Sequence, residues 1–297
     1  MYALQRITYT DWSGVFIPTS SADKLYQSAR SLVEGRQGLL AVGGPPGSGK
    51  SSALVWLLSR LKQTLDEPIA TLHFQASVVQ LPHEHFARSL YDALEAASCL
   101  KNTGENIRVL LCFALSDYCL RCKSGKLLIA IDDADQFGEE PMNELEQLSA
   151  CLEPFGVTLF AIFFCRFLPL DAPVRNSGAF KRLSMAFSGL SSVSDVSNWL
   201  TTRLATPSDH LPTLDPLLEY VRAQNVSTAE LSDCLWQEFR LYQSALDFTS
   251  WRMDAFLEAL QWISDSLSAN SGVLDKRLVK RAVAASGLWG PQGALVP

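Results

Sequence analysis

The sequence has little charge, and the charge that it has is not basic. Charged residues make up 19% of its 297 residues, and the formal net charge is −6. A protein whose main task is to grip nucleic acid usually carries an excess of positive charge. The composition therefore argues against general nucleic-acid binding and leaves room for DNA contact only at a local basic patch.

The sequence also lacks a long hydrophobic run. The longest, VTLFAIFFC at residues 157–165, is far shorter than the roughly 20 residues needed to cross a bilayer. Its length and composition predict a buried strand instead. The first residues, MYALQRITYTDW, do not show the basic-then-apolar pattern of a secretion signal. We therefore expect no membrane span and a cytoplasmic location.

The cysteines do not form a recognisable framework. There are seven, an odd number scattered among apolar neighbours, which is unlike a set of disulfides. Cys119-x-x-Cys122, with Cys112 nearby, is the one spacing that suggests zinc or redox chemistry, but it lacks a second pair and follows no strand. Buried free thiols are the favoured interpretation. His83 and His85 diverge if they lie on a helix, which argues against a shared metal.

What the sequence does contain is a glycine-rich stretch, GGPPGSGKSS at residues 43–52. It matches G-x-x-x-x-G-K-[ST], with Gly44, Gly49, Lys50 and Ser51 at the fixed positions. Glycines let the backbone adopt positive φ and turn its N–H groups inward, which makes a nest of donors for phosphate oxygens. An apolar run precedes the stretch and a helical pattern follows it, and this strand–loop–helix context is the one that the phosphate-binding loop (P-loop) requires.

The P-loop predicts a site for ATP and Mg²⁺. Lys50 would reach the β- and γ-phosphates, and the Ser51 hydroxyl would be a ligand of Mg²⁺. The residues predicted to bind the nucleotide are Gly44, Pro45, Pro46, Gly47, Ser48, Gly49, Lys50, Ser51 and Ser52.

A second motif supplies carboxylates. In LLIAIDDADQF at residues 127–137, an apolar strand ends at Asp132 and Asp133. A carboxylate at such a strand tip holds Mg²⁺ in P-loop proteins, so Asp132 is the predicted metal residue. Asp133 is then placed to orient and deprotonate the attacking water. The alternative is an aspartate pair that merely opens a turn, which Asp favours.

Strands and helices alternate through the first two thirds of the chain. Near-continuous apolar strands between helices predict an α/β fold, a parallel sheet with helices on both faces, followed by an all-helical region. The strand-like runs are residues 39–42, 69–74, 127–131 and 159–164, and the helices between them lie near 51–63, 83–99, 106–121 and 140–152. The predicted organisation is an N-terminal arm at 1–20, a core at 21–206, a helical lid at 207–290 and a tail at 291–297.

The order of P-loop, IDDADQF, the helix NELEQLSACL and the strand VTLFAIFFCRF resembles the AAA+ ATPases. The segment FKRLSMAFSGLSSVSDVSNWLTTRLA is similar to one branch of them. That bacterial branch holds the ExeA-type secretion ATPases, the ATPase part of DamX, and the DNA transposition regulators TniB, TnsC and MuB. The resemblance covers roughly residues 20–205 and implies ATP hydrolysis, ATP-dependent self-assembly and regulation of partner proteins.

Three departures from the family pattern bear on turnover. The second acidic residue is Asp133 where the family usually has Glu, and a shorter side chain can misplace the water. The sensor position after the fourth strand falls on Cys165 or Arg166, neither of which is the usual Asn or Thr. The arginine sensor of the lid would fall near AQNVSTAEL at residues 223–231, which contains no arginine. Slow or partner-dependent hydrolysis is therefore expected.

The resemblance also implies an arginine that acts on a neighbouring subunit's nucleotide. Arg182 in FKRLS is the best match, and Arg175 is the second; an ordinary surface arginine is the alternative. The leading hypothesis is therefore an ATP-driven homo-oligomeric switch whose protein partners the sequence does not name. A nucleotide-binding scaffold with little hydrolysis and a P-loop kinase are the other two hypotheses.

One local basic patch could contact DNA. It lies in LDKRLVKRAV, and a solvated helix face is the commoner meaning of such a run. Its cations, at helical spacing, are Lys276, Arg277, Lys280 and Arg281.

Overall fold

The computed structural model covers the whole chain in two compact units. It describes residues 2–6, 16–35, 37–78, 86–94, 107–134, 140–166, 180–205, 214–246, 250–270 and 273–286. The first unit comprises Met1–Ser13, Lys24–Gly44 and Leu54–Ala186, and the second comprises Gly14–Asp23, Pro45–Ala53 and Phe187–Pro297. The division at Gly44 and Pro45 assigns most of the P-loop to the second unit, although it follows directly from a strand of the first.

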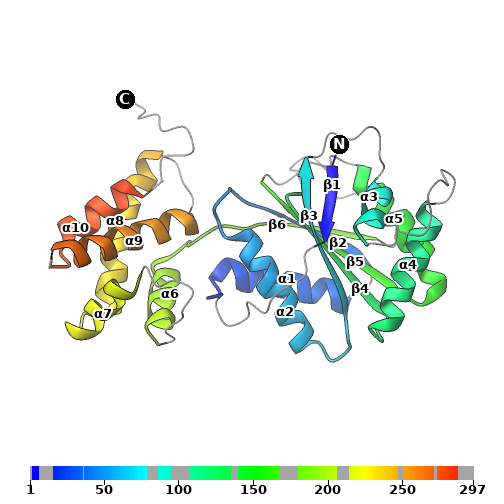
Figure 1. Ribbon diagram of the computed structural model, residues 1–297, viewed down its shortest axis with the longest axis horizontal. Coiled ribbons are helices and arrows are strands. Elements are labelled where there is room, and N and C mark those ends of the chain that lie inside the picture. The colour runs from blue at the N-terminus through cyan, green and yellow to red at the C-terminus, as the bar shows by residue number, and fades with distance from the viewer. Residues whose placement is uncertain are drawn as a thin grey trace. The chain divides into compact units, whose positions relative to one another are not determined.

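The first unit is built on a six-stranded sheet with strand order β1-β3-β4-β5-β2-β6 (Figure 1). Five neighbouring strands run parallel, and β1 pairs antiparallel with β3. The strands are β1 Tyr2–Arg6, β2 Gly38–Gly43, β3 Ala70–Val78, β4 Lys126–Asp132, β5 Thr158–Cys165 and β6 Lys181–Ala186. The fold class predicted from the alternating apolar strands and helices is thus confirmed.

Helices connect these strands, as parallel pairing requires. They are α1 Ser20–Glu34, α2 Lys50–Thr64, α3 Phe86–Ala93, α4 Ile107–Arg121 and α5 Glu140–Leu152, the last followed by a 3₁₀ turn at Glu153–Phe155. One core cluster joins α3, α4 and α5 to alternate residues of β4, among them Leu127, Ile129 and Ile131. On the central strands both faces are buried, which explains why their sequences are apolar without interruption.

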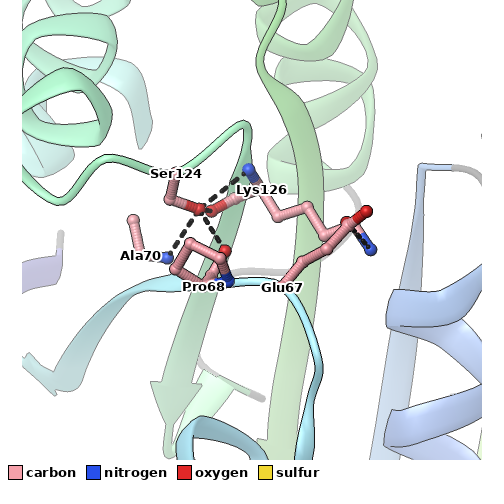
Figure 2. Close-up of polar contacts among 5 residues, drawn as sticks. All are labelled: Glu67, Pro68, Ala70, Ser124 and Lys126. Atoms are coloured by element: carbon pink, nitrogen blue, oxygen red, sulfur yellow. Dashed lines mark hydrogen bonds and ion pairs between the residues drawn. The ribbon is translucent and has the colours of Figure 1, made fainter.

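The edge where the parallel strands begin is held by one buried serine. Ser124 lies just before β4, and its Oγ is 3.2 Å from the Ala70 nitrogen and 2.6 Å from the Pro68 oxygen (Figure 2). The same oxygen lies 3.0 Å from the Lys126 nitrogen, and the Lys126 side chain pairs with Glu67 at 2.7 Å. Ser124 therefore connects the starts of β3 and β4.

The second unit contains five helices of the chain's later part. They are α6 Val193–Ala205, α7 Asp215–Ala223, α8 Thr228–Leu246, α9 Met253–Asn270 and α10 Lys276–Ala285. At the centre of their core the Trp251 ring is completely buried, stacked on Phe239 at 4.9 Å and edge-on to Phe256 at 5.2 Å. Among the described residues after 207, all regular structure is helical, as the periodicity predicts.

A buried carboxylate fixes Ser20, the first residue of α1, within this second unit. Asp195 accepts hydrogen bonds from the backbone nitrogens of Ser20 at 2.8 Å and Ser191 at 2.9 Å. Burial alone would raise the pKa of Asp195, but these bonds and those from the two serine hydroxyls outweigh it and leave the pKa lowered. The charged carboxylate is therefore the form that holds the two segments together.

Candidate nucleotide site

The P-loop begins where β2 ends. The Gly44 nitrogen donates a hydrogen bond to the Cys165 oxygen at 3.1 Å, which ties the start of the loop to the end of β5. Gly47 and Gly49 adopt φ of 76° and 92°, a region that residues with a Cβ rarely enter. The loop thus needs glycine at both positions, and α2 starts immediately after it at Lys50.

These residues fit a bound phosphate. The Ser48 hydroxyl is buried within the loop and has no hydrogen-bond partner among the described residues, although a buried hydroxyl normally has one. The Lys50 Nζ lies over the loop, donating to the Pro45 oxygen at 2.8 Å. Since the first N–H groups of a helix have no partner within it, the start of α2 adds further donors and a favourable dipole for an anion.

The two aspartates lie at the same edge of the sheet as the start of the P-loop. Asp132 is the last residue of β4 and is 5% exposed. Because β2, β5 and β4 are adjacent and parallel, Gly43 and Asp132 both end strands at the carboxyl edge of the first unit. This is the edge where open α/β sheets bind their ligands.

Asp133 has a strained backbone. Its φ is 55°, and its nitrogen donates to Asp132 Oδ1 at 3.1 Å. A non-glycine residue in the left-handed region costs free energy, and such residues concentrate at functional sites. The conformation supports a functional role for Asp133.

Mg²⁺ would find suitable ligands in this chain. It takes oxygen ligands, commonly one or two carboxylates together with phosphate oxygens and water. Asp132 offers a carboxylate, and the exposed Ser51 offers a hydroxyl oxygen. Lys50 and Ser51 belong to the second unit, whereas Asp132 and Asp133 belong to the first. Among the described residues, no group of three or more His, Cys, Asp or Glu side chains could hold a metal ion by itself.

The predicted trans arginine has a partner within its own chain. Arg182 lies on β6 opposite Leu39, the second residue of β2, and pairs with Glu146 of α5 at 2.5 Å. Only 18% of the Arg182 side chain is exposed. Its role towards a second subunit stays a prediction. Arg175, the second choice, lies outside the described residues.

The favoured interpretation of buried thiols holds for three of the described cysteines, Cys112, Cys119 and Cys165, but not for the exposed Cys122. Burial raises the pKa of Cys119 and of Cys112 to about 12, so both stay protonated thiols at neutral pH. Cys119 is buried whereas Cys122 is exposed, and both are free. Cys165, at the sensor position, is also buried, forms no disulfide and ends β5. The histidines at 83 and 85 lie outside the described residues.

The basic patch lies on one exposed face of α10. All four cations are exposed, while Val279, Ala282 and Val283 face the core. Asp275 caps the helix by accepting from the Leu278 nitrogen at 2.7 Å. The four cations, at the start and middle of the helix, are Lys276, Arg277, Lys280 and Arg281.

The sequence did not reveal which part of the helical unit touches the P-loop. In the family pattern the sensor of the lid would fall near residues 223–231, around the start of α8, where this sequence has no arginine. The structure instead places Met253 and Asp254, in the first turn of α9, against Gly49 and Gly47. The only local signal was an Arg and an Asp at the start of an apolar helical pattern, which is common in helices of any function.

Residues 33–166 match the protein family described as AAA domain. The matched segment includes the P-loop and both aspartates, and it ends just after β5. A comparison with curated proteins gives no match. Among the described residues, no helix combines the length and the apolar character that a membrane span requires.

Several solved structures have a similar backbone. Drosophila ORC bound to DNA matches with a TM-score of 0.52 and 14% identity, over 89% of this chain and 68% of that one. The ORC2 protein of Aeropyrum pernix, in ADPNP–ADP complexes, matches with a TM-score of 0.48 and 14% identity, over 93% and 72%. C. elegans PCH-2 matches with a TM-score of 0.38 and 11% identity, over 95% and 74%.

At such identities the likeness concerns the fold alone, and the Drosophila match carries it. Together with the strand order and the AAA-domain match, it identifies the architecture. The chain has the α/β fold of the AAA+ P-loop NTPases, with a helical subdomain after the sheet.

Proposed function

We propose that this protein binds ATP with Mg²⁺ and acts as an ATP-dependent oligomeric switch. The observation that carries the proposal is the P-loop itself. It combines two glycines at positive φ, a buried Ser48 hydroxyl without a partner among the described residues, and Lys50 at the start of α2. A plain surface turn needs neither a buried hydroxyl nor a helix start, so the three features together support a phosphate-binding role.

Each residue has a part in this proposal. The backbone of residues 44–52 and the Lys50 ammonium bind the phosphates, and Ser51 and Asp132 bind the metal. Bound Mg²⁺ would neutralise charge on the phosphates and thereby favour attack by water. The Asp133 carboxylate accepts a proton from that water. Arg182 acts in trans after exchanging Glu146 for a neighbouring subunit's nucleotide.

Partner and pathway belong to the proposal as well. The resemblance to the ExeA and TniB–TnsC–MuB branch favours regulation of partner proteins, on DNA or in a secretion system. The α10 cations support the DNA alternative. Lys276 and Arg277 occupy the first turn of α10, where the helix dipole disfavours positive charge. Cations that oppose the stability of their own helix are better explained by an anionic partner, such as a DNA backbone.

Size-exclusion chromatography tests the switch. We expect larger assemblies with a non-hydrolysable ATP analogue than without nucleotide, and a further shift with duplex DNA if the patch on α10 binds it. Lys280→Glu with Arg281→Glu is the patch variant, and Asp233→Lys on the exposed surface of α8 is its control. A monomer at all concentrations with ATP analogue would contradict the oligomeric switch.

The trans role of Arg182 has its own test. Subunits carrying Arg182→Ala and subunits carrying Asp133→Asn should each be nearly inactive alone. Mixed assemblies contain interfaces with an intact Asp133 and an intact Arg182, so part of the ATPase rate should return. No recovery in assemblies shown to be mixed would contradict the trans role.

A specific observation favours a second candidate, a nucleotide-binding scaffold with little hydrolysis. The residue beside Gly49 is Met253, whose Cβ lies 3.7 Å from the position of an added Gly49 Cβ. A methionine cannot stabilise charge that develops on a phosphate. Stoichiometric ATP binding without turnover, in the presence of partners, would favour the scaffold.

A further inference from the structure

The first turn of α9 lies directly against the P-loop. A Cβ placed on Gly47 would be 2.1 Å from Asp254 Oδ2 and 2.5 Å from Oδ1. The Asp254 nitrogen also donates to the Gly47 oxygen at 3.2 Å. Gly47 and Asp254 belong to the same compact unit. A carboxylate therefore occupies the space beside a glycine of the loop that is proposed to bind phosphate.

This carboxylate is engaged by a neighbouring arginine. Arg252 Nε donates to Asp254 Oδ1 at 3.0 Å, and Arg252 Nη2 donates to Oδ2 at 2.6 Å. The Ala255 nitrogen adds a third hydrogen bond, to Oδ1 at 2.7 Å. Such a two-pronged arrangement is the strongest geometry between guanidinium and carboxylate. It occupies the Nε and Nη2 donors of Arg252.

The two charges act in opposite directions on a bound polyphosphate. A carboxylate beside the loop repels the phosphates, and a guanidinium attracts them and matches their geometry. While Arg252 is paired with Asp254, the two effects largely cancel. A nucleotide bound at the loop must therefore compete with Asp254 for Arg252, with which Asp254 is paired.

We propose that Asp254 is a built-in competitor of the nucleotide phosphate, which holds Arg252 in reserve and so sets the affinity of the P-loop. This inference rests on the proposed nucleotide function. Asp254 is then a positioning residue that lowers the affinity of the chain for the nucleotide. A change that moves Asp254 away from Arg252 would tighten nucleotide binding. Because a triphosphate carries more charge than a diphosphate, the competition affects ATP more than ADP.

Direct binding measurements on charge variants test this inference. Asp254→Asn removes the competing charge and keeps the shape, and we expect ATP to bind about 3- to 10-fold more tightly, with a smaller gain for ADP. The expected factor is modest, because the Asp254 side chain is 48% exposed and water screens it. Arg252→Gln should weaken ATP binding by a similar factor. The double variant should return close to the wild-type affinity.

A purely structural role predicts a different result. If the pair only held α9 in place, both single variants would lower the melting temperature and weaken ATP and ADP equally. Tighter ATP binding by Asp254→Asn is an outcome that loss of structure cannot give. Weaker or unchanged ATP binding by a folded Asp254→Asn protein overturns the inference. If Asp254→Asn fails to fold, Asp254→Ser also removes the charge and suits a helix start. Its ATP affinity then provides the same test.

Two controls separate this inference from the proposed function. Asp265→Asn makes the same charge change on an exposed residue of α9, and should leave ATP affinity unchanged. Lys50→Ala should weaken ATP binding on the order of 100-fold in both the wild-type and the Asp254→Asn backgrounds. If wild type and every variant bind no ATP, both proposals fail. If wild type binds ATP through Lys50 but the Asp254→Asn affinity does not rise, only the competitor role fails.

Discussion

The two edges of the parallel sheet are held by different kinds of contact. At the edge where the strands begin, Ser124 satisfies backbone groups of Pro68, Ala70 and Lys126 within one buried cluster. At the edge where they end, Asp133 has a left-handed backbone beside the buried Asp132. The edge where the strands begin is held by hydrogen bonds to one buried hydroxyl. The edge where the strands end has a strained residue next to a buried carboxylate.

This contrast separates stability from function. A group whose partners all lie in the same fold contributes to the free energy of unfolding and can be lost without altering a ligand site. A strained or orphaned group costs stability and is retained where it serves a ligand or a reaction. The P-loop, with Gly47, Ser48 and Gly49, shares the character of the second edge.

The largest expected effect comes from Asp133→Asn at the carboxyl edge. An amide cannot accept the proton of the attacking water, so ATP turnover should fall by about 10²- to 10⁴-fold. Binding of Mg²⁺–ATP should remain, as measured by calorimetry alongside single-turnover assays. Asp132→Asn is the comparison variant, which should weaken the metal and hence binding. Normal hydrolysis by both variants would place the chemistry elsewhere.

Lys50→Ala should have the next largest effect, and on affinity rather than on turnover alone. A hydrogen bond between charged groups contributes up to about 3 kcal/mol, so ATP affinity should fall on the order of 100-fold. The melting temperature should not change, because Lys50 lies outside both core clusters. Lys62→Ala, on the exposed surface of α2, is the matched control. An affinity equal to wild type would remove the P-loop assignment.

The strands of the sheet could be predicted from the sequence because they are buried on both faces. Their apolar runs at 39–42, 69–74, 127–131 and 159–164 all correspond to observed strands. Tyr2–Arg6 was assigned to an arm, yet it pairs with β3 as an edge strand. Pairing between segments some 70 residues apart follows from tertiary contacts, and a short half-polar segment carries no local signal for it.

The candidate site divides in the same way. The P-loop and the Asp pair could be predicted because their chemistry depends on residue types at fixed spacing, and the structure places them at the expected strand ends. The roles of Lys50, Asp132, Asp133 and Arg182 stay predictions. The Arg252–Asp254 pair could not be found, because its proximity to Gly47 is created by the packing of α9, some 200 residues further along the chain.

A pH titration tests the sheet between its two edges. His73 lies within β3, and burial lowers its pKa to about 4 from the ordinary 6.5. Between these values the unfolded chain binds a proton that the folded chain does not, so stability falls as the pH decreases from 6.5 to 4. The loss attributable to His73 should approach about 3 kcal/mol.

The control for this titration is His73→Phe, a non-titrating ring. Its stability in urea should depend less on pH than that of wild type over the same window, whatever its absolute stability. The difference between the two slopes isolates His73 from carboxylates that also titrate near pH 4. If stability depended on pH equally in both proteins, His73 would take up its proton in the folded state as readily as in the unfolded state, and its pKa would not be lowered.

The smallest expected effect comes from Ser124→Ala, at the edge where the strands begin, and it tests directly whether this edge serves stability alone. Ser124→Ala leaves the Ala70 nitrogen and the Pro68 oxygen without the Ser124 hydroxyl, in a cluster where Ser124 is only 8% exposed. An unsatisfied buried group costs about 1–3 kcal/mol, which should appear as a lower melting temperature. ATP affinity should equal that of wild type, because the cluster lies where β3 and β4 begin, whereas Asp132 is the last residue of β4.

Glu67→Gln provides the matched control for Ser124→Ala. It removes an ion pair from the same edge, but the Glu67 side chain is 69% exposed, and exposed pairs contribute little. The Lys126 hydrogen bond and charge lower the Glu67 pKa, so any stabilisation by the pair is lost as the pH falls through that lowered pKa. We therefore expect no change in melting temperature at pH 7. If Ser124→Ala instead altered ATP affinity while leaving the melting temperature unchanged, the two edges would be coupled, and the division between a stabilising edge and a ligand-binding edge would be wrong.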